Sequence, residues 1–497
     1  MRIAVPGSSV IDWRSIYWVL GAFLGVLALC MLLPLGYDLL ALHQVSMAFV
    51  DAVAATACAS VVLLLAGFRH ERPALKQREG ILLVVLIWLA SCVFGALPFY
   101  FSAYFPSYAD AFFESASGFT TTGATVLAVL EDLPADLHLW RAFSHWLGGM
   151  GIVLLSIAIL PLIGQGGSDL YRAEFSGALA EKLQPRVIET ARTLWRIYLA
   201  LTAALFVALL IAGMGVFDAV CHAFSTLATG GFSTRTASIG AFDDPLIEYI
   251  IILFMLLAGI SFVQHYRLWV ERRVADVTRD YEIRAYLLLV LLAAAVIAIV
   301  LLREQQADSP TAWESSIRQA LFQAVSIVTT TGFVTADYAQ WQPVAQLILL
   351  SLMFVGGCTG STAGGLKVAR VKLMMKVIGR DFRQLSEPQG VFRIHLGGAA
   401  IPELTVSAML NLVYLALFAV LAASLVLASQ GLDLLTAVSA VIACQFNVGP
   451  GLGGVGPASN YAALSELSKW VLALSMVAGR LEFYTFFFVL TGAFWRR

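Results

Sequence analysis

Long apolar runs recur along the whole chain, and they constrain its fold more than any other feature. Each holds about twenty residues, the length of helix that crosses the hydrocarbon core of a bilayer. With 60% hydrophobic and 13% charged residues, the chain has too little charge to cover the surface of a soluble protein. We expect the first run to remain as an anchor, since it is too long for a signal peptide. We predict an all-α polytopic membrane protein with about ten transmembrane helices, near residues 16–37, 45–68, 81–104, 139–163, 195–216, 246–268, 284–303, 341–357, 405–429 and 467–491.

Basic residues gather in alternate loops, which predicts the orientation of the chain. Lys and Arg are concentrated in segments 69–79, 172–196, 267–284 and 367–393, whereas the intervening loops lean acidic. Because excess Lys and Arg mark the cytoplasmic side, we expect both termini in the cytoplasm. The formal net charge of −1 gives no sign of a nucleic-acid partner. The six cysteines lack ligand spacing, so we expect neither a disulfide framework nor a metal site built from them.

After an N-terminal two-helix hairpin, residues 1–79, the chain divides into four similar units. Each unit is a span, a short semi-polar segment on the outer side, and a second span, with expected boundaries 80–194, 195–282, 283–400 and 401–497. The outer segments read FESASGFTTTGAT, HAFSTLATGGFST, FQAVSIVTTTGFVT and SAVIACQFNVGPG, which aligns Gly123, Gly231, Gly332 and Gly449. The second spans carry a matching glycine, at Gly149, Gly259, Gly357 and Gly479. Two agreeing registers predict a fourfold repeat.

The outer segments have the properties of pore-lining elements. Each begins as a helix of about ten to twelve residues, too short to span a bilayer, and continues as a glycine-containing stretch. Irregular backbone at membrane depth is tolerated where it lines a water-filled cavity, so four such elements predict a ring around a central pore. Backbone carbonyls there would replace the water around a cation. The stretches contain no carboxylate, which favours a monovalent ion, and the helix C-termini would favour a cation.

The chain resembles the Trk/Ktr/HKT superfamily of potassium transporters, and within it the bacterial Trk branch. Besides the outer segments, the resemblance rests on HWLGGMGIVLLSIAILPLIG at 145–164, LYRAEFSG at 170–177, GGCTGSTAGGLKV at 356–368 and AGRLEFYT at 478–485. It covers nearly the whole chain and implies potassium uptake across the bacterial inner membrane. It also implies a pore of fourfold pseudosymmetry, a homodimer, and a cytoplasmic nucleotide-binding regulatory subunit (TrkA-like). No covalent or catalytic cofactor is expected, with K⁺ as the transported ion.

The resemblance assigns the ion-binding selectivity filter residue by residue. The expected K⁺ ligands lie at Thr121, Thr122, Gly123, Thr229, Gly230, Gly231, Thr330, Thr331, Gly332, Asn447, Val448 and Gly449. The fourth copy departs most, because Asn447 and Val448 replace threonines. In plant relatives a serine at the first filter glycine accompanies sodium preference, so Gly123 favours potassium.

A dense cluster of glycines in the third unit predicts a break in its second span. No helix survives this many glycines at about 1 kcal/mol each, and the family has a loop here that blocks the pore under the filter. The expected gate residues are Gly356, Gly357, Gly360, Thr362, Gly364, Gly365 and Arg480. Arg480 lies in an apolar run, where a charge is expensive and faces a cavity or a partner. The alternatives are a simple kink for the glycines and a structural ion pair for Arg480; the i, i+2 spacing does not by itself pair Arg480 with Glu482.

Two alternatives to potassium uptake stay open at this point. One is a sodium-permeable or ion-coupled symporter of the same superfamily, with Na⁺ or H⁺ as the coupling ion. The other is an intramembrane enzyme, which would need a nucleophile with a base or a metal constellation. The sequence has no HExxH, GxSxG or paired aspartate motif, so we expect no enzyme. We interpret His145, His222 and His265 as packing residues.

Overall fold

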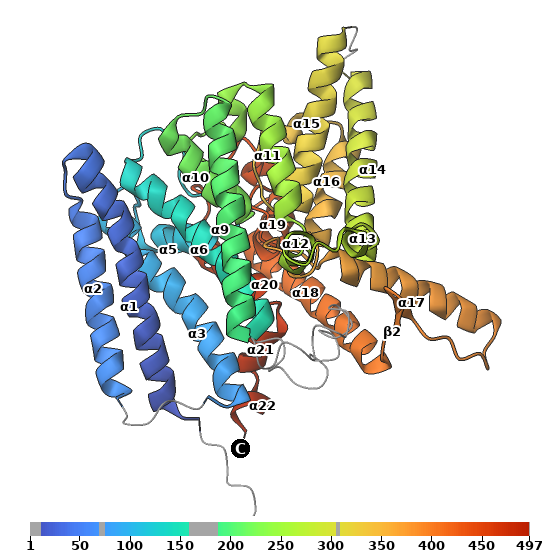
Figure 1. The fold of residues 1–497 in the computed structure, drawn as a ribbon, viewed down its shortest axis with the longest axis horizontal. Coiled ribbons are helices and arrows are strands. Elements are labelled where there is room, and N and C mark those ends of the chain that lie inside the picture. Colours follow the sequence, from blue (N-terminus) through green and yellow to red (C-terminus); the bar gives the residue numbers. More distant parts are fainter. Residues whose placement is uncertain (1–10, 69–74, 159–186, 305–308, 497) are drawn as a thin grey trace, which may run out of the picture.

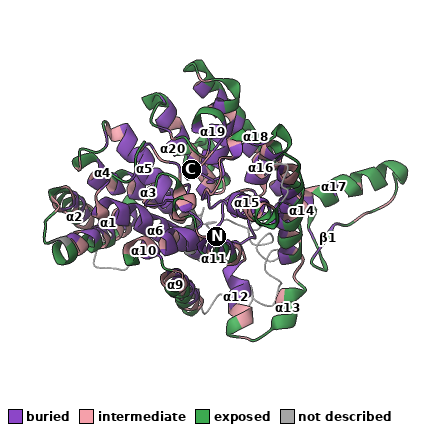
Figure 2. Cartoon of the chain, turned by 90° about the horizontal axis from the view of Figure 1, so that it is seen from above, coloured by how far each residue is buried: buried purple, intermediate pink, exposed green. Residues whose placement is uncertain are grey.

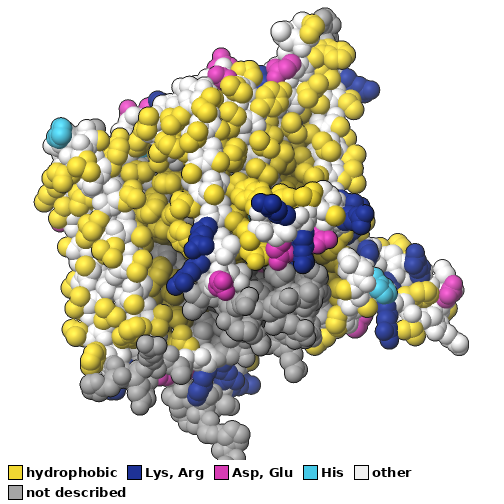
Figure 3. All heavy atoms as spheres, in the orientation of Figure 1, with side chains coloured by type: hydrophobic (Ala, Val, Ile, Leu, Met, Phe, Trp, Pro, Cys, Tyr) yellow, Lys and Arg dark blue, Asp and Glu magenta, His cyan; other side chains and the backbone are white. Residues whose placement is uncertain are grey.

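The protein is helical almost throughout. The computed structural model describes residues 11–68, 75–158, 187–304 and 309–496, and Figure 1 shows helices packed side by side in one body. Apolar side chains cover most of the face in Figure 3, and most Lys and Arg side chains on that face lie in its lower half. Such an apolar exterior is what a bilayer requires. Arg69, Arg72, Arg172, Lys182 and Arg186 of the predicted cytoplasmic loops lie outside the described residues.

An N-terminal hairpin flanks the repeats. It consists of α1 (Trp13–Tyr37) and α2 (Met47–Ala66), joined by a π-helical turn, η1 (Asp38–Leu42). The Ser60 hydroxyl donates to the Gly21 carbonyl at 2.7 Å, and a Cβ on Gly21 would lie 2.9 Å from the Leu64 nitrogen. Small residues therefore let the two backbones approach closely, as is common between membrane helices.

The remaining elements follow the predicted order of span, short helix and second span in four units. The first unit contains α3 (Gln77–Gly95), α4 (Leu97–Phe101), α5 (Tyr108–Phe119) and α6 (Ala135–Ala158), and the second contains α9 (Val187–Ile211), α10 (Val216–Leu227), η3 (Ser238–Phe242), α11 (Pro245–Ala258), α12 (Phe262–Trp269) and α13 (Val274–Thr278). The third unit contains α14 (Tyr281–Glu304), α15 (Pro310–Val328), η4 (Tyr338–Gln340), α16 (Pro343–Val355), α17 (Val368–Ser386), β1 (His395–Leu396) and β2 (Ala399–Ala400). The fourth unit contains α18 (Glu403–Ser429), α19 (Leu434–Gln445), η5 (Gly453–Val455), α20 (Glu466–Arg480), α21 (Tyr484–Leu490) and α22 (Gly492–Trp495).

Three of the four short helices begin at polar caps. Ser107, Ser309 and Asp433 each accept a backbone N–H in the first turn of α5, α15 and α19, which satisfies one of the otherwise unpaired donors at a helix start. Each short helix then packs against the second span of the preceding unit: α10 on α6, α15 on α11, α19 on α16, and α5 on α20. The last pair closes the ring and confirms the predicted fourfold arrangement.

Several predicted spans differ from the structure. Six helices among the described residues are long and apolar enough to cross a bilayer, and two bent pairs add up to two more. The spans predicted at 246–268 and 467–491 are broken rather than continuous, because α11–α12 bends by 97° and α20–α21 by 116°. The second bend has a local cause, since Glu482 and Phe483 both have positive φ. Of the span predicted at 139–163, residues beyond α6 lie outside the described part.

The span predicted at 341–357 breaks as expected. Helix α16 ends at Val355, and the chain resumes as α17, an amphipathic helix that projects sideways from the body (Figures 1 and 2). Strands β1 and β2 pair antiparallel beside it, with His395 opposite Ala400. Leu373 and Val377 of α17 share an apolar cluster with Ile394 and Leu396 of this hairpin.

Candidate ion pore

Each short helix ends in the same backbone motif, at the predicted filter. The residue after the last helical turn is left-handed in all four units: φ is 53° at Thr121, 54° at Thr229, 55° at Thr330 and 56° at Asn447. The next N–H then bonds back five residues, as Thr122 does to the Ser117 carbonyl and Val448 to the Ala443 carbonyl. This is the Schellman ending, which normally takes glycine. A β-branched threonine in that conformation is strained, and such strain is typical of functional sites.

Two residues further on, the four aligned glycines form a closed ring of contacts. Gly123, Gly231, Gly332 and Gly449 all have positive φ, between 79° and 101°. A Cβ on each would collide with a carbonyl oxygen of the next unit: Gly123 with Gly230, Gly231 with Thr331, Gly332 with Val448, and Gly449 with Thr122. The structure thus brings all twelve predicted filter residues together, with four equivalent carbonyls at one level. Only glycine fits these positions.

Buried hydroxyl and amide groups hold this ring in place. The Thr122 hydroxyl lies 2.7 Å from that of Thr120, and Thr331 makes the equivalent contact of 2.8 Å with Thr329. In the fourth unit, the Asn447 amide donates to the Thr122 hydroxyl at 3.0 Å. Asn447 occupies the position of Thr121, and in the fourth copy it therefore adds a side-chain contact between the fourth and first units.

The second glycine register is shifted in the fourth unit. A Cβ on Gly148 would collide with the Phe119 carbonyl, and a Cβ on Gly479 with the Gln445 carbonyl. Phe119 and Gln445 both lie two residues before the left-handed residue, so Gly479 matches Gly148. Its predicted match to Gly149 was wrong by one residue, because the sequence offers two adjacent glycines and only the contact distinguishes them.

A cavity of about 80 Å³ lies on the side of the ring that is predicted to face outward. The four filter glycines line it, together with Arg141 and Arg235. Arg235 pairs with Asp218 at 2.9 Å, and Arg141 pairs with Glu114. Neither arginine therefore leaves an unpaired positive charge that would repel a cation. On the adjoining loop, hydrogen bonds from the Thr236 hydroxyl and N–H hold the pKa of Glu131 below its ordinary value. Glu131, which accepts the N–H of the cavity-lining Thr236, therefore keeps its negative charge at neutral pH.

The predicted gate loop, residues 356–365, lies against the helix ends on the opposite side of the ring. The Gly364 N–H donates to the Thr330 hydroxyl at 2.6 Å, and the Gly365 N–H to the Phe446 carbonyl at 3.1 Å. The Thr362 hydroxyl contacts the carbonyls of Leu227 at 3.1 Å and Ala258 at 3.3 Å. The loop thus touches the ends of three of the short helices, α10, α15 and α19, which we call pore helices from here on. Positive φ at Gly356, Gly360 and Gly365 lets it fold back on itself.

Arg480 contacts the gate loop rather than a carboxylate. Its side chain is 2% exposed, and Nη1 donates to the Thr362 carbonyl at 2.9 Å. The ion pairs found in the described residues join Glu482 instead to Arg370, at 2.6 Å. The alternative of a structural ion pair for Arg480 therefore has no support in the described part of the chain.

Sequence reasoning missed a buried carboxylate that holds the gate loop. Glu282, near the start of α14, accepts the Thr359 N–H at 2.7 Å, the Thr359 hydroxyl at 3.0 Å and the Ala369 N–H at 3.2 Å. It therefore fixes both the loop and the first turn of α17. The sequence shows a glutamate at the start of an apolar span, which is a sign of a buried carboxylate. It does not show that Thr359 and Ala369 are the partners of this carboxylate.

The three histidines have local partners. His145 stacks on Phe232 and lies 3.3 Å from the Ser225 hydroxyl. His222 contacts the Ser233 hydroxyl at 2.9 Å, and His265 the Leu257 carbonyl at 2.9 Å. These contacts agree with packing roles.

Comparison with known proteins identifies the family. The sequence model of the TrkH family, described as a cation transport protein, matches residues 45–496. The chain belongs to the TrkH family. It is 43% identical over 431 residues to the Trk system potassium uptake protein TrkH of Escherichia coli K12, covering 86% of this chain and 88% of that protein. It is 40% identical over 492 residues to TrkH of Vibrio parahaemolyticus, covering 98% and 100%.

A crystal structure of the potassium transporter TrkH from Vibrio parahaemolyticus has the same fold. The TM-score is 0.89 at 38% identity, over 98% of this chain and all of that one. The superfamily and the fold predicted from sequence are thereby confirmed. The TrkH relatives are transport proteins, which contradicts the intramembrane-enzyme alternative. The TrkH-like motif at 170–177 and the end of the one at 145–164 lie outside the described residues.

Proposed function

We propose that the chain takes up potassium across the bacterial inner membrane through the carbonyl ring of its filter. The observation that carries this proposal is the cyclic contact of four glycines with four carbonyls, from Gly123 round to Thr122. Carbonyl oxygens replace the hydration shell of a monovalent cation without a fixed charge. The pore helices point their partially negative C-termini at the same place. The names of the TrkH relatives support potassium as the ion.

The gate loop and Arg480 are proposed to close this pore. The loop is buried against pore helices of three units, so an ion leaving the filter meets Thr362 and its neighbours. The Arg480 charge adds a repulsive barrier at the same level. Glu282 ties the loop to the first turn of α17, and Arg370 of α17 pairs with Glu482, two residues after Arg480. A movement of α17 would therefore reach both the loop and the segment that carries Arg480.

The regulatory subunit and the homodimer are part of the same proposal. The basic stretch of α17 follows the loop directly and supplies charges for a cytoplasmic nucleotide-binding subunit, at Lys372, Lys376, Arg380 and Arg383. Met375, Phe382 and Leu385 of α17 are at least 65% exposed, which suits contact with a second copy. The charge pattern of the loops supports cytoplasmic termini.

Arg480→Ala is expected to raise cation flux about fivefold, the effect of one lost hydrogen bond to the loop, with a further gain from the missing charge. Flux of K⁺ into liposomes, with and without the regulatory subunit, measures it. Arg480→Lys is the matched control, because it keeps the charge. If flux collapses in a well-folded Arg480→Ala protein, the barrier role is wrong.

Growth tests the proposed function in cells. A bacterial strain that lacks its own potassium uptake proteins but retains a regulatory subunit should grow at low external K⁺ when it makes this chain. The same strain with an empty vector should grow only at high K⁺. Failure to restore growth at normal protein level, or growth restored by added Na⁺ rather than K⁺, would contradict potassium uptake and favour the sodium alternative.

A further inference from the structure

A buried ion pair lies directly behind the filter of the first unit. Glu114 of α5 accepts a hydrogen bond from Arg141 Nε of α6 at 2.8 Å, and their side chains are 0% and 2% exposed. The Glu114 carboxylate also accepts the Thr125 hydroxyl at 2.9 Å and the Val126 N–H at 3.1 Å. The pair is therefore attached to the extended segment that follows Gly123, which we call the filter strand of the first unit although it is not part of a β-sheet.

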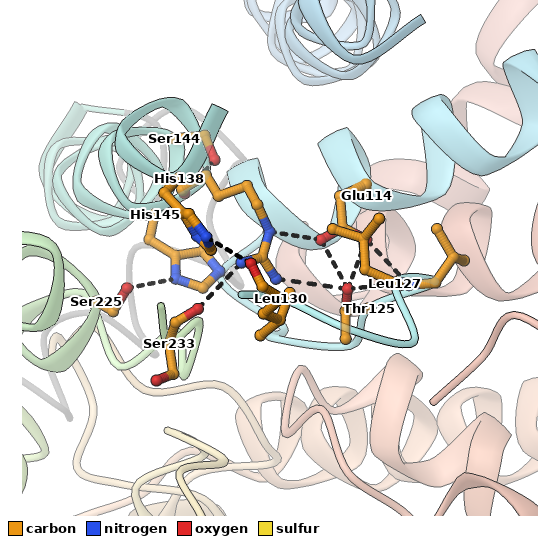
Figure 4. Close-up of polar contacts among 11 residues, drawn as sticks. Glu114, Thr125, Leu127, Leu130, His138, Ser144, His145, Ser225 and Ser233 are labelled. Atoms are coloured by element: carbon orange, nitrogen blue, oxygen red, sulfur yellow. Dashed lines mark hydrogen bonds and ion pairs between the residues drawn. The ribbon is translucent and has the colours of Figure 1, made fainter. Parts of the chain in front are cut away.

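Arg141 also reaches the filter strand of the second unit. Nη1 donates to the Ser233 carbonyl at 3.1 Å, Nη2 lies 3.4 Å from the Thr125 hydroxyl, and the guanidinium carbon lies 4.1 Å from the centre of the Phe232 ring. Figure 4 shows Glu114 and Thr125 on one side of these contacts and Ser233 on the other. Thr125 and Ser233 each lie two residues beyond a filter glycine. One side chain thus ties equivalent points of two adjacent filter strands.

The other units have a different contact at the equivalent place. The residue seven positions before the left-handed residue is fully buried in each unit: Glu114, His222, Gln323 and Ala440. His222 contacts Ser233 at 2.9 Å, Gln323 contacts Thr335 at 3.3 Å, and Ala440 has no polar group. Among these four positions, only Glu114 carries a formal charge, and its partner Arg141 is what crosses between units.

The charges of the pair have to balance, because Arg141 lines the outer cavity beside the filter glycines. An unpaired cation there would repel the entering ion, and Glu114 removes that repulsion. A buried ion pair stabilises a fold little better than apolar residues of similar size, whereas it can fix a particular geometry. Ion discrimination depends on the positions and field of the coordinating carbonyls. A pair that fixes the geometry of the filter segments therefore suits this position.

We propose that Arg141 and Glu114 are positioning residues for ion selectivity: together they form a neutral brace that sets the spacing of the first and second filter strands and hence the preference for K⁺ over Na⁺. The proposal rests on the proposed potassium function.

The brace is tested by a cycle of three variants in liposomes: Glu114→Gln, Arg141→Gln and the double variant. Glu114→Gln leaves the Arg141 charge uncompensated and should lower K⁺ flux by roughly tenfold. The double variant removes both charges, so K⁺ flux should recover. Its K⁺/Na⁺ flux ratio should still fall about fivefold, the equivalent of one lost hydrogen bond. Flux thus follows net charge while selectivity follows the brace, a separation that a merely structural role would not give.

Arg318→Gln is the matched control. Arg318 and Glu248 form another largely buried pair, 2.6 Å apart with side chains 13% and 7% exposed, and Arg318 lies on α15 twelve residues before Thr330. This control should lose stability without a change in the K⁺/Na⁺ ratio. If the charge variants do not fold, Thr125→Val removes the shared hydroxyl without any charge change and should lower the ratio in the same direction.

Folded brace variants with an unchanged K⁺/Na⁺ ratio would overturn the inference, as would an equal loss in Arg318→Gln. A wild-type protein that does not prefer K⁺ would instead contradict the proposed function, so the two failures are distinguishable.

Discussion

Gly123→Ser is expected to lower the K⁺/Na⁺ flux ratio by about tenfold, since it places backbone strain of about 1–3 kcal/mol in the filter itself. Gly123 has a φ of 81°, and a Cβ there would collide with the Gly230 carbonyl. The first and second filter strands must separate to admit it. A wider ring compensates less well for the water lost by K⁺ and admits hydrated or smaller ions more easily. Competition between K⁺ and Na⁺ for uptake measures the ratio.

Gly213→Ser is the control for this experiment. Gly213 has a similar φ of 91° but no atom near its Cβ position, and it lies in the turn before α10. It carries the same kind of backbone strain outside the filter. The account predicts normal selectivity for Gly213→Ser. Unchanged selectivity in Gly123→Ser would show that Gly123 is not part of the selective ring.

Deleting residues 357–362 is expected to raise K⁺ flux at least about tenfold without the regulatory subunit, because several hydrogen bonds of about 1 kcal/mol each hold the loop closed. The deletion removes Thr362 with its contacts to Leu227 and Ala258, and it removes the acceptor for Arg480. The K⁺ preference should be largely retained, since the filter ring stays intact. Flux into liposomes, with and without the partner, measures both.

The geometry of the loop makes this deletion reasonable for the fold. A Cβ on Gly356 would lie 2.9 Å from the Gly365 Cα, so the two ends of the loop are already adjacent. The Gly364 contact with Thr330 also remains available. Glu282→Gln is a milder variant, which weakens the anchoring of Thr359 and should act in the same direction. Flux that stays low and partner-dependent in both well-folded variants would contradict a gating role.

Periodic features of the chain could be predicted from its sequence, whereas contacts between distant segments could not. The four filter glycines recur at equivalent positions because each has a positive φ and no room for a Cβ. The same steric requirement in all four units therefore appears in the sequence as the same residue. The bend at Glu482 and Phe483 could not be predicted in this way, because neither residue type favours the positive φ that both adopt. Packing against the rest of the protein imposes it.

The polar contacts around the pore were hidden for the same reason. Glu282 and Thr359 are 77 residues apart, and Arg141 and Ser233 are 92 apart. No local pattern links such pairs. The Arg141–Glu114 pair was not predicted either, because both residues lie in segments that are mostly apolar or rich in glycine.

Potassium selectivity of the purified protein tests the central claim most directly. The wild-type chain and the form lacking residues 357–362 would be placed in liposomes, and K⁺ and Na⁺ uptake would be compared under equal gradients, with and without a pH gradient. The account predicts K⁺ uptake that exceeds Na⁺ uptake by about tenfold or more in both forms, as a carbonyl filter should give. A pH-gradient dependence would identify coupling to protons. Equal uptake of the two ions, or no K⁺ uptake by either form, would contradict the account.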